Sequence, residues 1–315
     1  MGHFLLHILK KRKDVIVAMS FNIFMQHVVN GISIGSLYAL IAIGYTMVYG
    51  ILRLINFAHG DIFMMAGYFL IFTMVNFSLP WFISIPIVCI LTILLGVFTE
   101  RIAYRPLRNA PRMSIMISAI GVSFLLENLA TYLFTGVPKG FPELPILTHI
   151  IHVGEVSFPV VSIITPVITI ILLIALLYIV NHTKVGMAMR AVSKDYETAR
   201  LMGVKINWVI AVTFAIGSLL ASVGAIFWGS KYPSIYPLMG VMPGLKCFVA
   251  AVLGGIGNIF GAVLGGLILG MGETLLVAFL PNMTGYRDAF AFILLIVMLL
   301  VKPTGLLGER ITDKV

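Results

Sequence analysis

Two long stretches without charge constrain this chain more than any other feature. Residues 15–52 and 62–99 each run for 38 residues without Asp, Glu, Lys or Arg. A straight helix of that length would measure ~57 Å, whereas the hydrocarbon core of a bilayer is ~30 Å thick. The chain is therefore predicted to cross a membrane, and each stretch must break or turn.

Composition sets the fold class. Hydrophobic residues make up 60% of the chain, charged residues only 10%, and the mean hydropathy is +1.07. An ordinary globular domain carries about 25% charged residues. A transmembrane β-barrel would show ~10-residue segments of alternating polarity, which this sequence lacks. We predict an all-α polytopic membrane protein.

The chain has a net charge of +9, and its basic residues are unevenly distributed along the sequence. Sixteen of the 21 Lys and Arg residues lie in four patches, at residues 10–13, 101–112, 184–205 and 302–314. The positive-inside rule predicts that these patches, and with them both termini, are cytoplasmic. No basic stripe with interleaved aromatic residues is present, so the partner is predicted to be the lipid bilayer and not nucleic acid.

The break points of the two long stretches decide the number of crossings. Pro80 and Trp81 favour a break in the second stretch, and Asn30-Gly31 is a candidate in the first. An even number of crossings must then separate Lys13 from Arg101. Four helices satisfy this, and so does a single span with a re-entrant segment at 51–61. About eight to ten membrane helices are expected, near residues 15–31, 33–52, 62–76, 81–100, 113–134, 158–181, 206–229, 250–272 (two short pieces) and 288–302.

Two segments interrupt the apolar pattern, and they are predicted to be broken or re-entrant. Residues 51–61 bring Arg, Asn, His and Asp between hydrophobic runs, and residues 250–266 are dense in glycine. Non-helical backbone at membrane depth is tolerated only inside protein or around a water-filled cavity. Paired interruptions therefore indicate a central translocation path, with candidate residues Asn56, His59, Gly60, Asp61, Gly255 and Asn258. For the second segment, close helix packing through Gly261 and Gly265 is the alternative.

Ionisable side chains inside apolar segments are functional candidates, because their burial is costly. The candidates are Arg53, His59, Asp61, Glu127 and Glu273, with His27 and Lys246 near span ends. A carboxylate satisfied by a structural partner and a proton relay are both open for Glu127 and Glu273. No nucleophile, P-loop or metal-binding motif is present. We therefore predict no catalytic residue, no metal and no cofactor on this chain.

A charged segment at residues 186–204 separates two uncharged stretches. Helical spacing places Ala188, Val192, Tyr196 and Ala199 on one face, together with Met202, and most of the charges off it. We predict a single amphipathic helix outside the membrane.

The run from Glu197 to Gly203, ETARLMG, resembles the loop that importer permeases of the ATP-binding-cassette class present to their ATPase subunits. Thr198 departs from the usual Glu-Ala-Ala pattern. Longer matches follow along the chain: NGISIGSLYALIAIGYTMVYG at 30–50, INFAHG at 55–60, ERIAYRPLR at 100–108, AVLGGIG at 251–257 and KPTGLLG at 302–308. Together they are similar to branched-chain amino-acid permeases of the LivH type.

This resemblance implies one permease subunit of an importer in a prokaryotic plasma (inner) membrane. The partners would be two ATPase subunits that carry the ATP, a second homologous permease and an extracytoplasmic binding protein that delivers Leu, Ile, Val or related small amino acids. Glu197, Ala199, Arg200 and Gly203 would couple to the ATPase. The implied domains are a basic cytoplasmic extension at 1–20, a permease domain at 21–308 and a cytoplasmic tail at 309–315.

A different class of transporter also fits the apolar pattern. An ion-gradient-driven secondary transporter or channel for a small polar solute could use Glu127, Glu273 or Asp61 as a relay. It would move its solute without any partner subunit.

Overall fold

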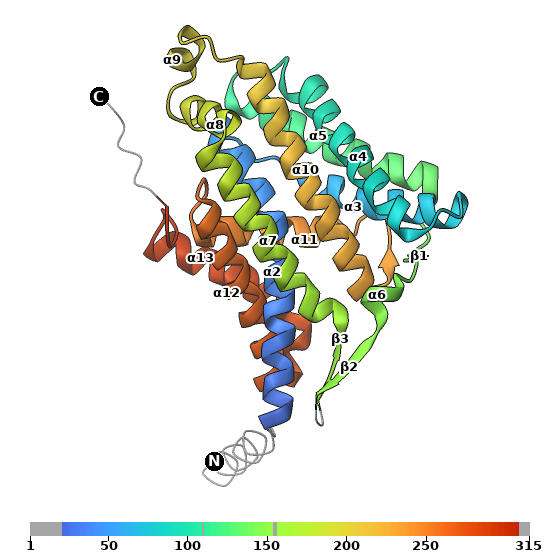
Figure 1. Ribbon diagram of the computed structural model, residues 1–315. Coiled ribbons are helices and arrows are strands. Elements are labelled where there is room, and N and C mark those ends of the chain that lie inside the picture. Colours follow the sequence, from blue (N-terminus) through green and yellow to red (C-terminus); the bar gives the residue numbers. More distant parts are fainter. Residues whose placement is uncertain (1–20, 109, 154–155, 309–315) are drawn as a thin grey trace.

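The computed structural model describes residues 21–108, 110–153 and 156–308. These residues form a helical bundle with two short two-stranded sheets. The extension at 1–20 and the tail at 309–315, both predicted to be cytoplasmic, lie outside the described residues. At one end of the bundle lie α8 (Lys184–Lys194) and α9 (Tyr196–Leu201), and at the other lies the hairpin of β2 (Ile150–Val153) and β3 (Val156–Pro159) (Figure 1).

Seven described helices are long and apolar enough to cross a membrane. They are α2 (Phe21–Leu52), α4 (Trp81–Thr99) continued by η2 (Glu100–Tyr104), α5 (Arg112–Phe134), α7 (Val160–His182), α10 (Ile206–Lys231), α12 (Ile259–Phe279), and α13 (Arg287–Val301) with its preceding turn η3 (Pro281–Tyr286). Two shorter apolar pieces are α3 (His59–Ile71) continued by η1 (Phe72–Asn76), and α11 (Val241–Gly254). This confirms the all-α class and agrees with the expected helix number.

The small elements connect the long helices at the hairpin end of the bundle. The single turn α6 (Pro145–Thr148) leads into the β2–β3 hairpin. Strand β1 (Lys139–Gly140) pairs antiparallel with β4 (Ser234–Ile235), so Lys139 lies opposite Ile235. This pairing ties the loop after α5 to the loop after α10.

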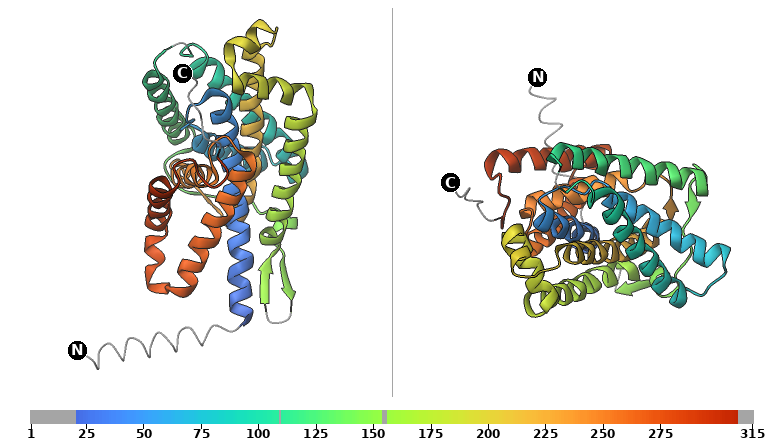
Figure 2. Two further views of the ribbon diagram at one scale, coloured as in Figure 1. Left: turned by 90° about the vertical axis from the view of Figure 1, so that its left-hand side faces the viewer. Right: turned by 90° about the horizontal axis from the view of Figure 1, so that it is seen from above.

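Helix α2 is the axis of the bundle. It packs against α12, α10, α11 and α7, and Figure 2 shows it between the α12–α13 pair and α7. Residues 33–48 of this helix are buried without interruption. The absence of charge from residues 33–48 follows from this position, because no side of this part of the helix is exposed.

The predicted break at Asn30-Gly31 is wrong, since α2 runs through it as one helix. Gly31 serves close packing instead. A Cβ at this position would lie 2.8 Å from the Met271 sulfur of α12 and 3.2 Å from its Cα. The arrangement is the alternative one, a single span followed by an interruption.

The start of α2 lies at the hairpin end of the bundle. The Gln26 Nε2 donates a hydrogen bond to the Ser157 carbonyl oxygen of β3 over 3.2 Å. Arg108, just beyond α4, donates to Asn207 at the start of α10, near α9. Phe21 and Arg108 therefore lie at opposite ends, separated by three passes of the chain. Lys13 lies outside the described residues, so its predicted position on the same side as Arg101 stays a prediction.

The two predicted interruptions are confirmed. Helix α2 ends at Leu52, and Arg53 adopts a left-handed conformation with φ 53° before α3 begins at His59. Helix α11 ends at Gly254 and α12 begins at Ile259. The break before Trp81 is also confirmed, because η1 ends at Asn76 and α4 starts directly after Pro80.

Glycines bring the central helices into backbone contact. A Cβ on Gly270 of α12 would lie 2.2 Å from the Gly35 nitrogen of α2. A Cβ on Gly265 would lie 2.0 Å from the Ala250 oxygen of α11, and one on Gly261 would lie 2.4 Å from the Gly254 oxygen. The close-packing interpretation of Gly261 and Gly265 is thus confirmed. Such contacts matter because lipid offers helices no hydrophobic gain from meeting each other.

The segment at 186–204 forms two helices instead of the single one predicted. Asp195 takes an extended conformation between α8 and α9, and its carboxylate accepts hydrogen bonds from the Glu197 and Thr198 amides, both at 3.0 Å. The N-cap begins a new helix in a new direction. Of the predicted apolar face, Val192 and Ala199 are buried, but Tyr196 and Met202 are 40% and 80% exposed.

The glycine contact between α2 and α12 leads to a stability prediction. Gly270→Ala should lower the melting temperature of the detergent-purified chain, because overpacking a close contact costs roughly 1–3 kcal/mol. Gly121→Ala is the matched control, since Gly121 of α5 has no atom within 4 Å of an added Cβ. The melting temperature of each variant is measured by heating samples to a series of temperatures and quantifying the remaining folded protein by size-exclusion chromatography. Equal melting temperatures for Gly270→Ala and Gly121→Ala would contradict the packing account.

Candidate functional site

Three polar side chains of the first interruption, Asn56, His59 and Asp61, are buried, whereas Arg53 is exposed. Asn56 is buried and accepts a hydrogen bond from the Tyr104 hydroxyl over 2.6 Å. The His59 ring packs edge-on against Tyr45, with ring centroids 4.7 Å apart. A Cβ on Gly44 would lie 2.5 Å from the His59 ring, so this position of α2 must lack a side chain. His59 is thereby clamped between α2 and α10.

The next two residues of this segment are held by other helices. Gly60 lies against the Gly240 oxygen, 2.5 Å from where its Cβ would be. Asp61 is buried and accepts a hydrogen bond from the Ser123 hydroxyl of α5. Glu127, one turn further along α5, is also buried. The predicted residues Asn56, His59, Gly60 and Asp61 therefore share one buried cluster at the start of α3.

The second interruption fastens the end of the described chain. Gly255, at φ 107°, packs so closely on Gly308 that a Cβ would lie 2.3 Å from the Gly308 nitrogen. Asn258 caps α12 by accepting from the Gly261 amide, and its Nδ2 donates to the Leu307 oxygen, both over 3.0 Å. Gly255 and Asn258 thus form a separate cluster from Asn56 to Asp61. Their place on a translocation path stays a prediction.

Lys246 joins two carboxylates from two other helices. Its Nζ lies 2.9 Å from Glu273 Oε1 of α12 and 2.7 Å from Asp288 Oδ1 of α13. The Tyr38 hydroxyl of α2 donates to Glu273 Oε2 over 3.0 Å. Lys246 and Glu273 are buried, whereas the Asp288 side chain is 52% exposed. Glu273 therefore has the structural partner that the sequence left open, and a charge at this depth is stable because it is paired.

An aromatic cavity lies beside Lys246. Its volume is about 280 Å³, and it is lined by Tyr38, Trp228, Tyr232, Ser234, Tyr236, Met239, Met242, Pro243 and Lys246. We call it the outer cavity, because it lies at the hairpin end of α10. This cavity was not predicted from the sequence. The available signal was the density of aromatic residues at 228–236, next to Lys231 and ahead of Lys246.

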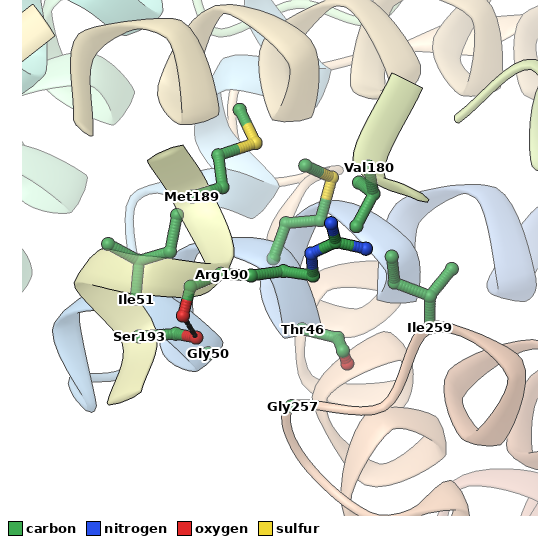
Figure 3. A pocket seen from close by; sticks show the side chains of 10 residues that line it. Thr46, Gly50, Ile51, Val180, Met189, Arg190, Ser193, Gly257 and Ile259 are labelled. Atoms are coloured by element: carbon green, nitrogen blue, oxygen red, sulfur yellow. Dashed lines mark hydrogen bonds between the residues drawn. The ribbon is translucent and has the colours of Figure 1, made fainter. Parts of the chain in front are cut away.

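A smaller cavity of about 130 Å³ lies toward the α8 end of the bundle. Figure 3 shows the Arg190 side chain of α8 extending across it between Thr46 of α2 and Ile259. Gly50, near the end of α2, and Gly257, in the second interruption, line the same cavity. We call it the inner cavity. It brings α8 together with the end of α2 and the start of α12.

The predicted coupling residues lie on or beside α9, at the tip of the bundle (Figure 1). Glu197 and Arg200 are exposed, and Ala199 is buried against the rest of the chain. Gly203 follows the helix at φ 83°, a conformation that favours glycine. Thr198, the departure from the usual pattern, donates its hydroxyl hydrogen to Asp195 Oδ2 over 2.6 Å. Leu201 and Met202 are 87% and 80% exposed.

In the ranges that the structure describes, no three His, Cys, Asp or Glu side chains are grouped so that they could hold a metal ion.

Comparison with known proteins gives a family match along most of the chain. The family described as "Branched-chain amino acid transport system / permease component" matches residues 27–299. The high-affinity branched-chain amino acid transport system permease protein BraD of Pseudomonas aeruginosa is 40% identical over 305 residues, which cover 93% of this chain and 98% of that protein. The corresponding LivH of Escherichia coli (strain K12) is 40% identical over 303 residues, with the same coverage.

Among solved structures, PsaBC from Streptococcus pneumoniae in complex with Fab has a TM-score of 0.48 at 15% identity and covers 93% of this chain and 96% of that one. The long apolar helices and the family match lead to one conclusion. This chain is an integral membrane protein and belongs to the family of permease components of branched-chain amino acid transport systems.

Proposed function

We propose that this chain is one permease subunit of an ATP-binding-cassette importer in a prokaryotic plasma membrane, and that it moves leucine, isoleucine, valine or related small amino acids. The observation that carries the proposal is 40% identity over 93% of the chain to permeases named for branched-chain amino acids. An extracytoplasmic binding protein delivers the substrate. ATP hydrolysis takes place on two partner subunits, and a second homologous permease completes the membrane part.

The α8–α9 segment is the proposed contact with the ATPase. Leu201 and Met202 expose nearly all of their apolar surface at the tip of α9, flanked by the charges of Glu197 and Arg200. Exposed apolar surface rimmed by polar groups is typical of protein–protein contacts. The buried Ala199 keeps α9 seated on the permease, so a force applied at the exposed side is carried into the bundle.

A movement of α8 would act directly on the inner cavity. Arg190 and Met189 of α8 line the inner cavity together with Gly50 and Gly257. Both chain interruptions therefore adjoin the helix that the ATPase would move. In this mechanism, closure of the ATPase subunits shifts α8, and α2 and α12 tilt at their interrupted ends.

The orientation follows from this assignment. The α8–α9 end faces the cytoplasm, and the β2–β3 hairpin and the outer cavity face the binding protein. Helix α2 then begins at the external side, and the segment at 302–308, which is hydrogen bonded to Leu253 and Gly254, lies toward the cytoplasm.

An ion-gradient-driven transporter is the less favoured function. The relatives are components of transport systems, which implies partner subunits. Glu273, one of its candidate relays, is ion-paired with Lys246.

The first test reconstitutes the complex. Proteoliposomes that contain the purified permease pair and ATPases should take up labelled leucine only with ATP at the ATPase side and loaded binding protein at the other. A protonophore should leave the initial rate unchanged, because no ion gradient drives the step. Leucine uptake by this chain alone under an imposed ion gradient would overturn the importer proposal.

The second test addresses α9. Met202→Glu and Glu197→Lys should each abolish co-purification of the ATPase and reduce ATP-dependent leucine uptake at least tenfold, because they introduce charge or reverse it at the contact. Insertion into the membrane should be normal, since both side chains are exposed. Val137→Glu is the matched control, because Val137 is 67% exposed in the loop after α5, away from α9. Full ATPase recovery with both α9 variants would refute the docking assignment.

A further inference from the structure

We propose that the outer cavity is a transient subsite for a free zwitterionic amino acid with a branched aliphatic side chain, in which the Lys246 ammonium binds the substrate carboxylate. The inference rests on the proposed importer function, because it names a place where the delivered substrate is held on this chain. Its evidence is the size of the cavity, the chemistry of its walls and the ion pairs of Lys246.

The size and walls of the outer cavity suit a small aliphatic side chain. An apolar cavity of about 150 Å³ holds benzene, and the outer cavity measures about 280 Å³. Its walls combine the rings of Tyr38, Trp228 and Tyr232 with the thioethers of Met239 and Met242. Small-molecule sites are typically lined by such apolar and aromatic groups around a few fixed polar ones.

The cavity is already open to the surface of the chain. Tyr236 is 43% exposed and Met242 is 36% exposed, whereas Tyr38 and Met239 at the far side are buried. A ligand can therefore enter past the exposed residues and reach Lys246 without any helix separating.

Lys246 has one permanent carboxylate partner and one exchangeable one. Glu273 is 2% exposed and also accepts from the Tyr38 hydroxyl, so α2, α11 and α12 hold it in place. Asp288 belongs to the first turn of α13 and is 52% exposed. Water can stabilise the Asp288 carboxylate when it leaves the Lys246 ammonium, but it cannot do this for Glu273.

A zwitterion fits this exchange without adding net charge. The substrate carboxylate takes the place of Asp288 at the Lys246 Nζ, and the released Asp288 carboxylate pairs with the substrate ammonium. Binding exchanges partners and moves no proton or covalent bond.

The chain offers its own fluorescent reporter. It has three tryptophans, Trp81, Trp208 and Trp228, and of these Trp228 lines the cavity. In the Trp81→Phe/Trp208→Phe variant of the full chain, leucine should change the Trp228 emission saturably. Leucinol, which lacks the carboxylate, should bind at least tenfold more weakly. An unchanged emission, or equal affinities for leucine and leucinol, would overturn the subsite.

Charge variants in the same background separate binding from folding. Lys246→Gln/Glu273→Gln removes both buried charges together, so neither remains unpaired, and it should weaken leucine binding at least tenfold. Lys231→Gln is the control, because Lys231 donates to Asn30 and Ser33 and does not line the cavity. Its leucine affinity should stay within twofold of the parent.

Asp288→Asn keeps the test decisive if the double variant does not fold. 4-Methylpentanoate has the carboxylate and side chain of leucine but no ammonium. The variant should lose at least fivefold of the preference for leucine over 4-methylpentanoate, because Asp288 is the proposed ammonium partner. A purely structural Asp288 would leave that preference unchanged, which would refute the exchange.

The outcome can be separated from that of the importer proposal. A silent Trp228 in a chain whose reconstituted complex imports leucine would overturn the subsite alone. A Trp228 that responds to leucine, in a complex that does not import it with ATP, would support the subsite and overturn the importer assignment.

Discussion

The contact between α2 and α12 supports the rest of this structure. Inside a bilayer, helices gain little by hiding apolar side chains from lipid, so they associate through close packing and a few polar contacts. Gly270 and Gly35 bring the two backbones together, and the other central helices pack around this pair. Residues 33–48 of α2 are buried on every side, so a charged side chain there would need a buried partner, and this explains why this part of the chain carries no charge.

The absence of water inside the bundle explains why polar residues gather at the two helix breaks. Where a helix breaks inside the bundle, its free backbone groups need partners from the chain. After α11, the amides of Leu306 and Leu307 donate to the Leu253 and Gly254 oxygens, and the Asn258 side chain caps α12. After α2, the chain passes through Arg53 and re-enters the bundle at His59. Both breaks adjoin the inner cavity, so the least regular backbone lies beside α8, the helix that reaches out of the bundle.

The sequence predicted what depends on local composition and missed what depends on contacts between distant residues. Charge-free runs located the long helices, and polar or glycine-rich interruptions located both breaks. The local sequence Asn30-Gly31 is typical of a helix break, but Gly31 is needed for the close contact with Met271 of α12. The division of the α8–α9 segment depends on the Asp195 cap, which a search for helical periodicity alone overlooks. Lys246 and Glu273 could each be named as candidates, but their pairing required the packing of α11 on α12.

The two cavities place a cation at each end of the part of α2 that runs from Tyr38 to Thr46. Lys246 adjoins the outer cavity beside Tyr38, and Arg190 crosses the inner cavity beside Thr46. These two α2 positions are eight residues apart, or ~12 Å along the helix axis. The residues between them are buried, and Tyr45 packs on the clamped His59. A carboxylate on its way through this chain would meet a cation at either mouth and a tightly packed, apolar stretch between. Such an arrangement opposes passive leakage of a zwitterion from one cavity to the other, unless α2 or one of its neighbours moves.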